Sequence, residues 1–312
     1  MTREEPTVDF SVVISCHFEE RSIAEFHERL SETLASLERS YEIIYVNDGS
    51  TDGTLAALEK IFERDPHVAA VVDLFRNSGQ PAAVTAGTTH ARGESFVFMD
   101  SDLQLDPEDL PRLIAEHDKG FDIVSGHRTE RTDSALRRLP SLLANTAMRR
   151  LSRTDLRDFG CTYKIVDGRL LRGFEFGPFK PIRMPYLIGA AGRVTDVAVN
   201  HHPRPYGESG WTFSKLLSYF VEILVGISER PFQLLSAVLL LAGALFVVRM
   251  VVNVVWPFSL LPEVTGGLLL NVIVVSFLVG AGISAAIGEY VLRSYRLLLG
   301  QPAYVVRKLL SR

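Results

Sequence analysis

Apolar and polar positions along residues 8–128 follow two alternating patterns. Short runs of buried-type residues are each followed by a segment in which apolar residues recur at helical spacing. We expect five strands, VDFSVVIS, YEIIYVN, VAAVVDL, SFVFM and FDIVSG, and helices that begin at Ser22, Thr54, Gln80 and Pro107. Ser22 and Glu25 form a capping-box pattern for the first helix, which we expect to end near Arg39. Such alternation predicts an α/β fold with a Rossmann-like, mainly parallel sheet and helices on both faces.

Two long apolar segments lie near the end of the chain. Residues 231–255 contain one charge, Arg249, and residues 264–288 contain none. Each segment exceeds the roughly 20 apolar residues that cross a bilayer. Buried core helices are the alternative, but they would need a second hydrophobic core. We therefore expect a two-helix transmembrane hairpin within residues 231–290.

Charges around the hairpin predict its orientation. The connector WPFSLLPE has no Lys or Arg, whereas Lys215, Arg230 and the basic tail 291–312 lie outside the open end of the hairpin. This is the positive-inside pattern. It predicts a multi-pass protein of the plasma (inner) membrane with a cytoplasmic tail. We place the domain of residues 1–205 in the cytoplasm too, since MTREEPTVDF contains no secretory signal.

Residues 206–230 connect this domain to the hairpin. The sequence WTFSKLLSYFVEILVGISER places its polar residues on one helical stripe, which predicts an amphipathic helix at the membrane interface. A helix that packs on the soluble core is the alternative. The preceding HHPRPYGESG is either a passive linker or a loop that contacts a lipid-borne substrate.

Composition narrows the class of ligand. The chain has a formal net charge of -4, and residues 231–312 carry six Lys/Arg against two acids, which leaves -8 on residues 1–230. An acidic domain has no general attraction for nucleic acid or anionic substrates, so a phosphate ligand needs a metal or a local Arg cluster. Cys16 and Cys161 have no zinc-site spacing and fit a reducing compartment.

Polar side chains follow the predicted strands at their carboxyl ends, where open α/β sheets bind ligands. Asp100 and Asp102 come directly after SFVFM, with Asp106 and Pro107 next as N-cap and first residue of a helix. Two carboxylates of this kind suit Mg²⁺ or Mn²⁺. Such a cation would neutralise the charge that develops on a departing diphosphate.

Several ordered motifs carry a resemblance to a known family. SVVISCHFEE, YVNDGSTDGT, RNSGQPAAVTAG and FMDSDLQLDPEDL resemble the nucleotide-binding half of family 2 inverting glycosyltransferases with the GT-A fold. RDFGCTYK, RPYGESGWTFSKL and the terminal apolar segments resemble the polyprenyl-phosphate branch of that family. The resemblance implies an enzyme that transfers a sugar from a nucleotide sugar, UDP- or GDP-linked, to a polyprenyl phosphate. Packing of several hairpins into a homo-oligomer is compatible with it.

The resemblance also implies roles for individual residues. Asp48 and Glu20 match positions that line the nucleotide pocket, and the metal and diphosphate positions are matched by Asp100, Asp102 and Gln104. Asp158 matches an acid that is named as catalytic in this family, and we expect Asp102 to be the second catalytic residue. If the acceptor is an ionised phosphate, Asp158 need not act as a strong base and can orient the sugar or the acceptor. The acceptor phosphate would be held by Arg128, Arg137, Arg138, Ser141 and Arg204.

Other features bear on specificity. Residues 128–157 contain eight arginines and three acids, a local excess suited to phosphate. Gln80 stands where members of this family often have Lys, and Cys16-His17 replace the usual residues of the first loop. The identity of the nucleotide-sugar donor is therefore left open.

A processive polysaccharide synthase is one alternative function, but the chain lacks the Gln-x-x-Arg-Trp motif. An inactive membrane scaffold is the other, although the acidic motif residues are all present.

Overall fold

The computed structural model describes residues 7–128, 154–206 and 300–312, together with scattered helical positions between 272 and 295. The chain divides into two compact units, Met1–Phe220 with Pro302–Arg312 and Val221–Gln301. The first unit contains every strand described below. Residues 302–312 of the chain therefore return to the unit that contains its first residues.

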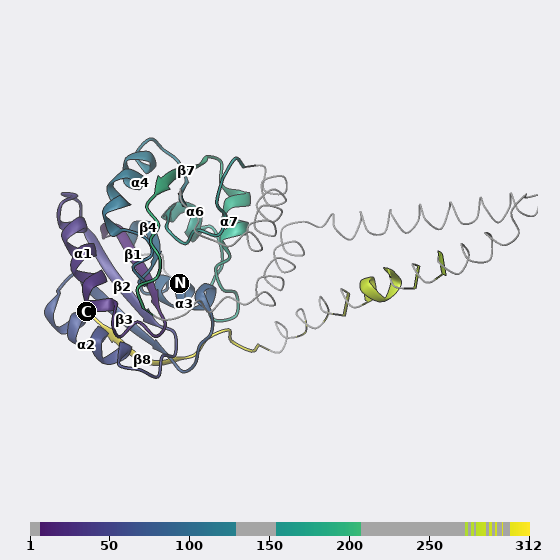
Figure 1. The fold of residues 1–312 in the computed structure, drawn as a ribbon, viewed down its shortest axis with the longest axis horizontal. Coiled ribbons are helices and arrows are strands. Elements are labelled where there is room, and N and C mark those ends of the chain that lie inside the picture. The colour runs from purple at the N-terminus through teal and green to yellow at the C-terminus, as the bar shows by residue number, and fades with distance from the viewer. Residues whose placement is uncertain are drawn as a thin grey trace, which may run out of the picture. The chain divides into compact units, whose positions relative to one another are not determined.

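An eight-stranded sheet forms the centre of the described part of this unit, in the order β7-β5-β6-β4-β1-β2-β3-β8 (Figure 1). Neighbouring strands among β4, β1, β2 and β3 are parallel, as are β5 and β7, whereas β6 and β8 run antiparallel to their neighbours. The strands are β1 (Val8–Cys16), β2 (Tyr41–Asn47), β3 (Val68–Leu74), β4 (Gly93–Asp100), β5 (Ile123–Arg128), β6 (Lys164–Asp167), β7 (Val194–Val199) and β8 (Val306–Ser311).

Helices cover both faces of the sheet. One hydrophobic cluster joins α1, α2 and α4 to one face, and a second joins α3, α6 and α7 to the other. The helices are α1 (Ile23–Ala35), α2 (Thr54–Arg64), α3 (Gln80–Thr88), η1 (Pro107–Asp109), α4 (Leu110–His117), α6 (Gly168–Arg172) and α7 (Met184–Ala190). The α/β class and the mainly parallel sheet expected from the sequence are confirmed.

The β1 strand shows why continuous apolar runs form this layer. Val12 and Ile14 belong to one cluster and Val13 to the other, and all three are fully buried. Successive side chains of a strand point to opposite faces, so a strand that is covered on both faces must be apolar throughout. Each such side chain contributes about 1.5–3 kcal/mol through its burial.

The capping box expected at the start of α1 is wrong. The Ser22 side chain makes no cap hydrogen bond to the helix backbone. Its hydroxyl donates to the carboxylate of Glu19 instead. Glu19 and Ser22 are buried together, and a buried polar group without a hydrogen-bond partner is costly, so the hydroxyl pairs with the Glu19 side chain. The helix also ends at Ala35 rather than near Arg39.

Asp106 likewise fails to cap the helix that follows it, although the helical segment begins at Pro107 as expected. Its carboxylate accepts from Arg29 at 2.7 Å and contacts His202 Nε2 at 2.8 Å. Asp106 thus connects α1 to the segment near residue 202. Charged partners from distant segments have displaced the local cap at Asp106, whereas the partner of Ser22 is the nearby Glu19.

Part of the sequence interpretation lies outside the described residues. This holds for residues 129–153, which include Arg137, Arg138 and Ser141, for the expected interfacial helix after residue 206, for the apolar segment 231–255 and for much of 264–288. In the part of the chain that the structure describes, we find no helix with the length and hydropathy of a membrane span.

Candidate active site

The carboxyl ends of β4, β1 and β2 lie side by side at one edge of the sheet. Strand β1 is flanked by β4 on one side and by β2 on the other, so the connections after β1 and β3 lead in opposite directions along the sheet. A crevice at such a switch point is the usual ligand site of an open parallel sheet. Asp48 follows β2, Asp100 ends β4, and the loop after Cys16 follows β1.

Asp100 is held from three sides. One carboxylate oxygen accepts from Thr162 Oγ1 at 2.9 Å, and the other accepts from Gln80 Nε2 at 2.5 Å and lies 3.5 Å from Ser15 Oγ. Burial, followed by the nearby charge of Asp102, raises the pKa of Asp100 to about 6. The pair therefore concentrates negative charge that a cation would stabilise.

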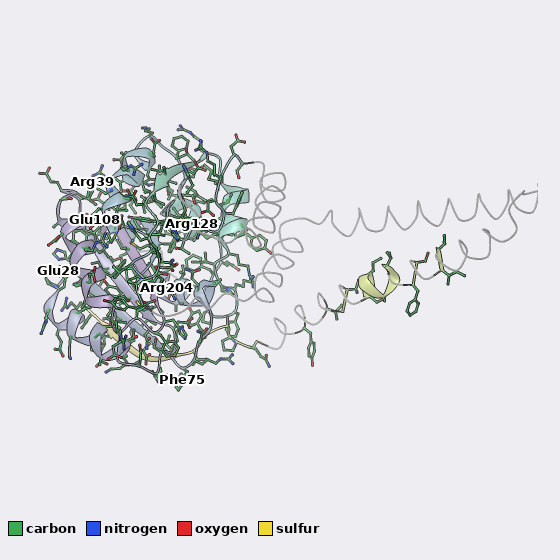
Figure 2. The ribbon with its side chains drawn as sticks, viewed as in Figure 1. Glu28, Arg39, Phe75, Glu108, Arg128 and Arg204 are labelled. Carbon is green, nitrogen blue, oxygen red and sulfur yellow. The ribbon has the colours of Figure 1, made fainter. Side chains whose placement is uncertain are left out.

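Asp102 contacts a cation from a distant segment. Its Oδ2 accepts from Arg204 Nη2 at 2.7 Å, and its Oδ1 accepts from the backbone N–H of Gln104 at 3.1 Å. The side chain of Asp102 is buried, and Figure 2 labels Arg204 on the same domain. Leu103, directly after Asp102, adopts a φ of 58°, a left-handed conformation that is strained for a residue other than glycine.

Backbone pairing places Arg204 beside Asp102. Leu105 and His201 form an isolated antiparallel bridge, and the N–H of His202 donates to the carbonyl of Gln104 at 2.8 Å. The side-chain amide of Gln104 donates to the carbonyl of His202 at 3.4 Å. The segment expected to contact the acceptor is thus paired with the segment expected to bind the metal.

The carboxylate that the sequence analysis missed is Glu19. It is 8% exposed, and its Oε1 lies 3.7 Å from Arg204 Nη2. Burial raises the pKa of Glu19 to about 7, and the charges of Asp102 and Asp100 add to the rise. Glu19 is therefore a third carboxylate that interacts electrostatically with this pair.

Glu20, the residue that the resemblance selected, lies elsewhere. Its carboxylate is exposed and accepts from the N–H of Gly53, at the start of α2, at 3.0 Å. Phe18, just before the two acids, has a φ of 61°. This turn interrupts the alternation of the strand, so the direction of Glu19 and Glu20 could not be counted from β1. The sequence signal that could have indicated a buried Glu19 was Ser22, three residues later. The same spacing is equally typical of the start of a helix.

Asp48 is buried in the turn after β2. Its two oxygens accept from the backbone N–H groups of Ser78 at 2.7 Å and Gly79 at 3.0 Å. Burial raises the pKa of Asp48, and the two amides and the nearby His17 act against that rise. A carboxylate has about four acceptor positions, so Asp48 can accept further donors from a ligand.

Asp158 and Arg128 pair with each other. Arg128 Nε donates to Asp158 Oδ2 at 2.7 Å, and Nη2 donates to Oδ1 at 3.1 Å. The N–H of Gly160 also donates to Oδ1 at 3.1 Å. Asp158 is 4% exposed, so the two-pronged contact fixes the orientation of the Arg128 side chain at the end of β5.

The carboxylates of Asp100 and Asp102 have the chemistry of a Mg²⁺ or Mn²⁺ site. Within residues 7–128, 154–206 and 300–312, no group of three or more His, Cys, Asp or Glu side chains has the geometry of a closed metal site. Mg²⁺ commonly uses one or two protein carboxylates and completes its shell with water and substrate phosphate. Asp102 already pairs with the positive guanidinium of Arg204, and the pKa of Asp100 is raised. Both observations indicate that a positive charge is favoured at this position.

Comparison with known proteins supplies the family. The family model described as "Glycosyl transferase family 2" matches residues 11–174, more than half of the chain. The chain belongs to glycosyl transferase family 2. The matched residues contain most of β1 and all of β2 to β6, and they include Asp48, Asp100, Asp102 and Asp158.

Curated relatives cover nearly the whole family 2 transferase. An undecaprenyl-phosphate 4-deoxy-4-formamido-L-arabinose transferase from Proteus mirabilis is 32% identical over 96% of this chain and 94% of its own. The protein of the same name from Pseudomonas fluorescens is 33% identical over 96% of this chain and 89% of its own. The similarity therefore extends well beyond the family 2 region.

A solved structure supports the fold. Glucosyl-3-phosphoglycerate synthase from Mycobacterium tuberculosis, in complex with Mn²⁺ and UDP-glucose, has a TM-score of 0.54 at 18% identity and covers 72% of this chain and 81% of its own. At this identity the likeness shows the GT-A-like fold of the family 2 transferase and nothing of its substrate.

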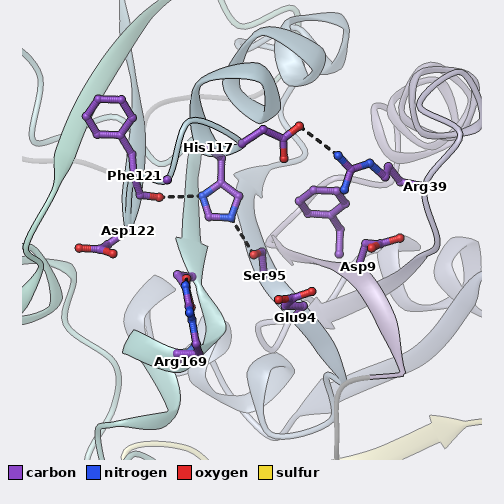
Figure 3. A pocket seen from close by; sticks show the side chains of 12 residues that line it. Asp9, Arg39, Glu94, Ser95, His117, Phe121, Asp122 and Arg169 are labelled. Carbon is purple, nitrogen blue, oxygen red and sulfur yellow. Dashed lines mark hydrogen bonds and ion pairs between the residues drawn. The ribbon is translucent and has the colours of Figure 1, made fainter.

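A pocket, drawn in Figure 3, lies at the amino ends of the strands, whereas these carboxylates lie at the carboxyl ends. It has a volume of about 250 Å³, and residues at or just before the starts of β1, β4 and β5 line it, among them Asp9, Ser95 and Asp122. His117 contacts Ser95 Oγ at 2.8 Å and the carbonyl of Phe121 at 2.9 Å. The chemistry expected of the family 2 transferase lies at the carboxyl ends instead.

Proposed function

We propose that this family 2 transferase moves a sugar from a UDP- or GDP-sugar to a polyprenyl phosphate, with inversion at the anomeric carbon. The observation that carries the proposal is the contact between Asp102, in the motif after β4, and Arg204, in the segment that precedes the apolar region. That contact brings an expected diphosphate site next to an expected acceptor site. The names of the relatives support undecaprenyl phosphate as the acceptor.

The donor half of the site would use the acidic residues. Asp100 and Asp102 would hold a Mg²⁺ or Mn²⁺ ion, with Gln104 beside them. When bound, the ion supplies charge neutralisation for the departing nucleoside diphosphate. Asp48 would accept hydrogen bonds from the base or ribose, and its contacts with Ser78 and Gly79 keep it in place for that role. The fold of the Mn²⁺-bound neighbour is compatible with this arrangement.

The acceptor half would use arginines. A guanidinium can bind phosphate through two parallel hydrogen bonds, so Arg204 and Arg128 suit a lipid phosphate. Arg137, Arg138 and Ser141, outside the described residues, would complete this set. The phosphate is already ionised near neutral pH, and a strong general base is not needed. Asp158 would therefore orient Arg128 and thereby the acceptor, and in-line attack would invert the anomeric centre.

The membrane location is part of the same proposal. A polyprenyl acceptor resides in a bilayer, and residues 231–255 and 264–288 have the length and hydropathy to enter one. The Lys and Arg residues on both sides of that region support a cytoplasmic position for the catalytic domain and the C-terminal residues. Nucleotide sugars would then reach the carboxyl edge of the sheet from the cytosol.

A donor panel tests the proposal. Membranes that contain the protein are incubated with undecaprenyl phosphate, Mg²⁺ or Mn²⁺ and a set of radiolabelled UDP- and GDP-sugars. The 4-deoxy-4-formamido-L-arabinose of the relatives is the first sugar to include. We expect label in the lipid fraction with one donor. Label in a water-soluble polymer would instead support a processive synthase, and no transferred label with any donor would reject both.

A further inference from the structure

The C-terminal strand reaches the nucleotide side of the site through one arginine. We infer that Arg307 on β8 is a positioning residue for the donor site, and that it acts through Asp73 and Asn47 on the turn that carries Asp48. The inference rests on the proposed function in one respect, the assignment of Asp48 to the nucleotide. The chain of contacts itself is independent of that assignment.

The first contact joins β8 to a buried carboxylate of β3. Arg307 Nε donates to Asp73 Oδ2 at 2.6 Å, and Nη2 donates to Oδ1 at 3.0 Å. Asp73 is 1% exposed, whereas the Arg307 side chain is 43% exposed. In Figure 1 β8 lies at the edge of the sheet beside β3. The arginine thus extends from the surface to a carboxylate inside the domain.

A shift in strand register gives Arg307 its direction. Lys308 lies opposite Asp73 and Val306 lies opposite Leu74, with an irregularity between these two pairs. Arg307 is therefore the extra residue of β8 at this point. Such bulges bend a strand and redirect a side chain, and they recur next to functional sites.

The second contact joins Asp73 to β2. Asn47 Nδ2 donates to Asp73 Oδ1 at 2.8 Å, and Asn47 is fully buried. Asn47 is the last residue of β2 and directly precedes Asp48. Its own Oδ1 lies 3.4 Å from the N–H of Ser50, across the turn. Asn47 therefore supports the turn of residues 47–50 from inside the domain.

The turn has little room to adjust if this support is lost. The N–H of Asp48 donates to the carbonyl of Cys16 at 2.9 Å. A Cβ placed on Gly49 would lie 2.2 Å from the carbonyl carbon of Arg76, so the turn packs tightly against the segment that binds the Asp48 carboxylate. A shift of Asn47 would then move Asp48 relative to Ser78 and Gly79.

Charge explains why Arg307 matters to Asn47. Among the described residues, the side-chain donors to Asp73 are Arg307 and Asn47. Without the guanidinium, a buried carboxylate would retain one neutral donor, and such a group must take up water or a proton. Either change competes with the Asn47 contact.

Attachment of β8 does not depend on Arg307. The strand is paired along β3, and Lys308 Nζ donates to Glu59 Oε1 at 2.8 Å. At the end of the strand, Arg312 donates to the carbonyls of Asp65, Val68 and Phe62. Lys308 therefore provides a matched control: it lies next to Arg307 on the same strand, and its ion pair is at the surface.

The test compares Arg307→Ala, Arg307→Lys and Lys308→Ala in the full-length protein. The binding of UDP and of GDP, each with Mn²⁺, is measured by calorimetry, and donor and acceptor KM values are measured in the transfer assay. We expect Arg307→Ala to weaken nucleotide binding and raise the donor KM by about tenfold, the scale of one charge-assisted hydrogen bond. The nucleotide affinity and donor KM of Arg307→Lys should lie between those of the parent protein and Arg307→Ala. The acceptor KM should be the same in all variants, and Lys308→Ala should have the parent values throughout.

Hydrogen exchange provides a measurement that needs no ligand. Amides of residues 47–50 and 78–79 should exchange faster in Arg307→Ala and at the parent rate in Lys308→Ala. In an Asn47→Ala background, Arg307→Ala should have little further effect, because the two residues act along one path. Unchanged exchange in Arg307→Ala, or full additivity with Asn47→Ala, would overturn the inference. Failure of the parent protein to bind either nucleotide would count against the proposed function and leave the exchange result to decide the inference.

Discussion

Arg204 Nη2 donates to Asp102 Oδ2 at 2.7 Å, although the two residues are 102 positions apart in the sequence. The residue expected at the acceptor phosphate thus contacts a residue expected at the metal. A cation that binds Asp102 must share this carboxylate with the guanidinium or displace it. Binding at the donor and acceptor halves of the site should therefore be coupled.

Replacement of Arg204 tests this coupling. We expect Arg204→Ala to bind Mn²⁺ more tightly in the absence of nucleotide, by severalfold to about tenfold, because a competing positive charge is removed. Sugar transfer should nevertheless fall, since the acceptor phosphate loses a partner. Mn²⁺ binding is measured by calorimetry. Arg39→Ala is the control, because Arg39 pairs with Asp118 at the surface, away from these carboxylates. Unchanged Mn²⁺ affinity in Arg204→Ala would contradict the coupling.

The raised pKa values predict a pH dependence of cation binding. Asp100, with a pKa of about 6, and Glu19, with a pKa of about 7, hold their protons more tightly in the folded protein than in the unfolded chain. Without a metal, their contribution to stability is therefore greatest at low pH and falls as the pH rises to about 7. A divalent cation competes with these protons, so its affinity should rise by up to about tenfold per pH unit below pH 6 and level off above pH 7.

The measurement is the increase in melting temperature caused by Mn²⁺ across this pH range. Glu19→Gln serves as the control. It should remove the pH dependence near pH 7, which comes from Glu19, and keep the dependence near pH 6, which comes from Asp100. An Mn²⁺ effect that is equal at pH 5.5 and 7.5 would show that neither carboxyl group is linked to the ion.

Asp158 should act by orientation, through Arg128. We expect Asp158→Asn to lower kcat by about tenfold to a hundredfold, the range typical of misplaced reacting groups, with the same shape of the pH–rate profile as the parent protein. Arg128→Lys should produce a similar loss, because a lysine cannot reproduce the two-pronged contact. If the Asp158→Asn profile loses its acidic limb, Asp158 is a general base and the orientation model is wrong.

Gly49 should be required for the fold of the donor turn. Its φ is 66°, and an added Cβ would lie 2.2 Å from the backbone of Arg76. We expect Gly49→Ala to lower the stability by about 2 kcal/mol or more, with a melting temperature at least about 5 °C lower. Gly177→Ala is the control, since no atom lies within 4 Å of a Cβ there. Equal melting temperatures for the two variants would contradict the tight packing of the turn.

The central strands could be predicted from the sequence because they are buried on both faces. The expected runs YEIIYVN and VAAVVDL match β2 and β3 residue for residue. A strand of this kind is apolar throughout and ends abruptly at a polar turn. The same abrupt ends marked the edge at which Asp48 and Asp100 lie.

The edge strand β8 could not be predicted in this way. Its sequence VRKLLS contains two basic residues and follows long apolar segments, so it reads as a charged tail. Lys and Arg are common on edge strands, where they discourage pairing with other chains. The strand becomes recognisable through its partner β3, which is more than 230 positions away in the sequence.

Side-chain pairs also required the structure. Motif matching selected Arg128 and Asp158 separately, but it could not show that they bind each other. It selected Glu20 over Glu19, because the direction of each side chain depends on the turn at Phe18. Contacts of this kind depend on backbone geometry and on the pairing of distant segments, which no local pattern encodes.

The most direct test of the central claim is a mass spectrum of the lipid product. Purified full-length protein is incubated with the donor selected by the panel, Mn²⁺, and either undecaprenyl phosphate or undecaprenol. The account predicts a glycosyl phosphate of the lipid with the phosphorylated acceptor, no product with the alcohol, and no product from a folded Asp102→Ala protein. Equal product from the alcohol, or undiminished product from Asp102→Ala, would contradict the account.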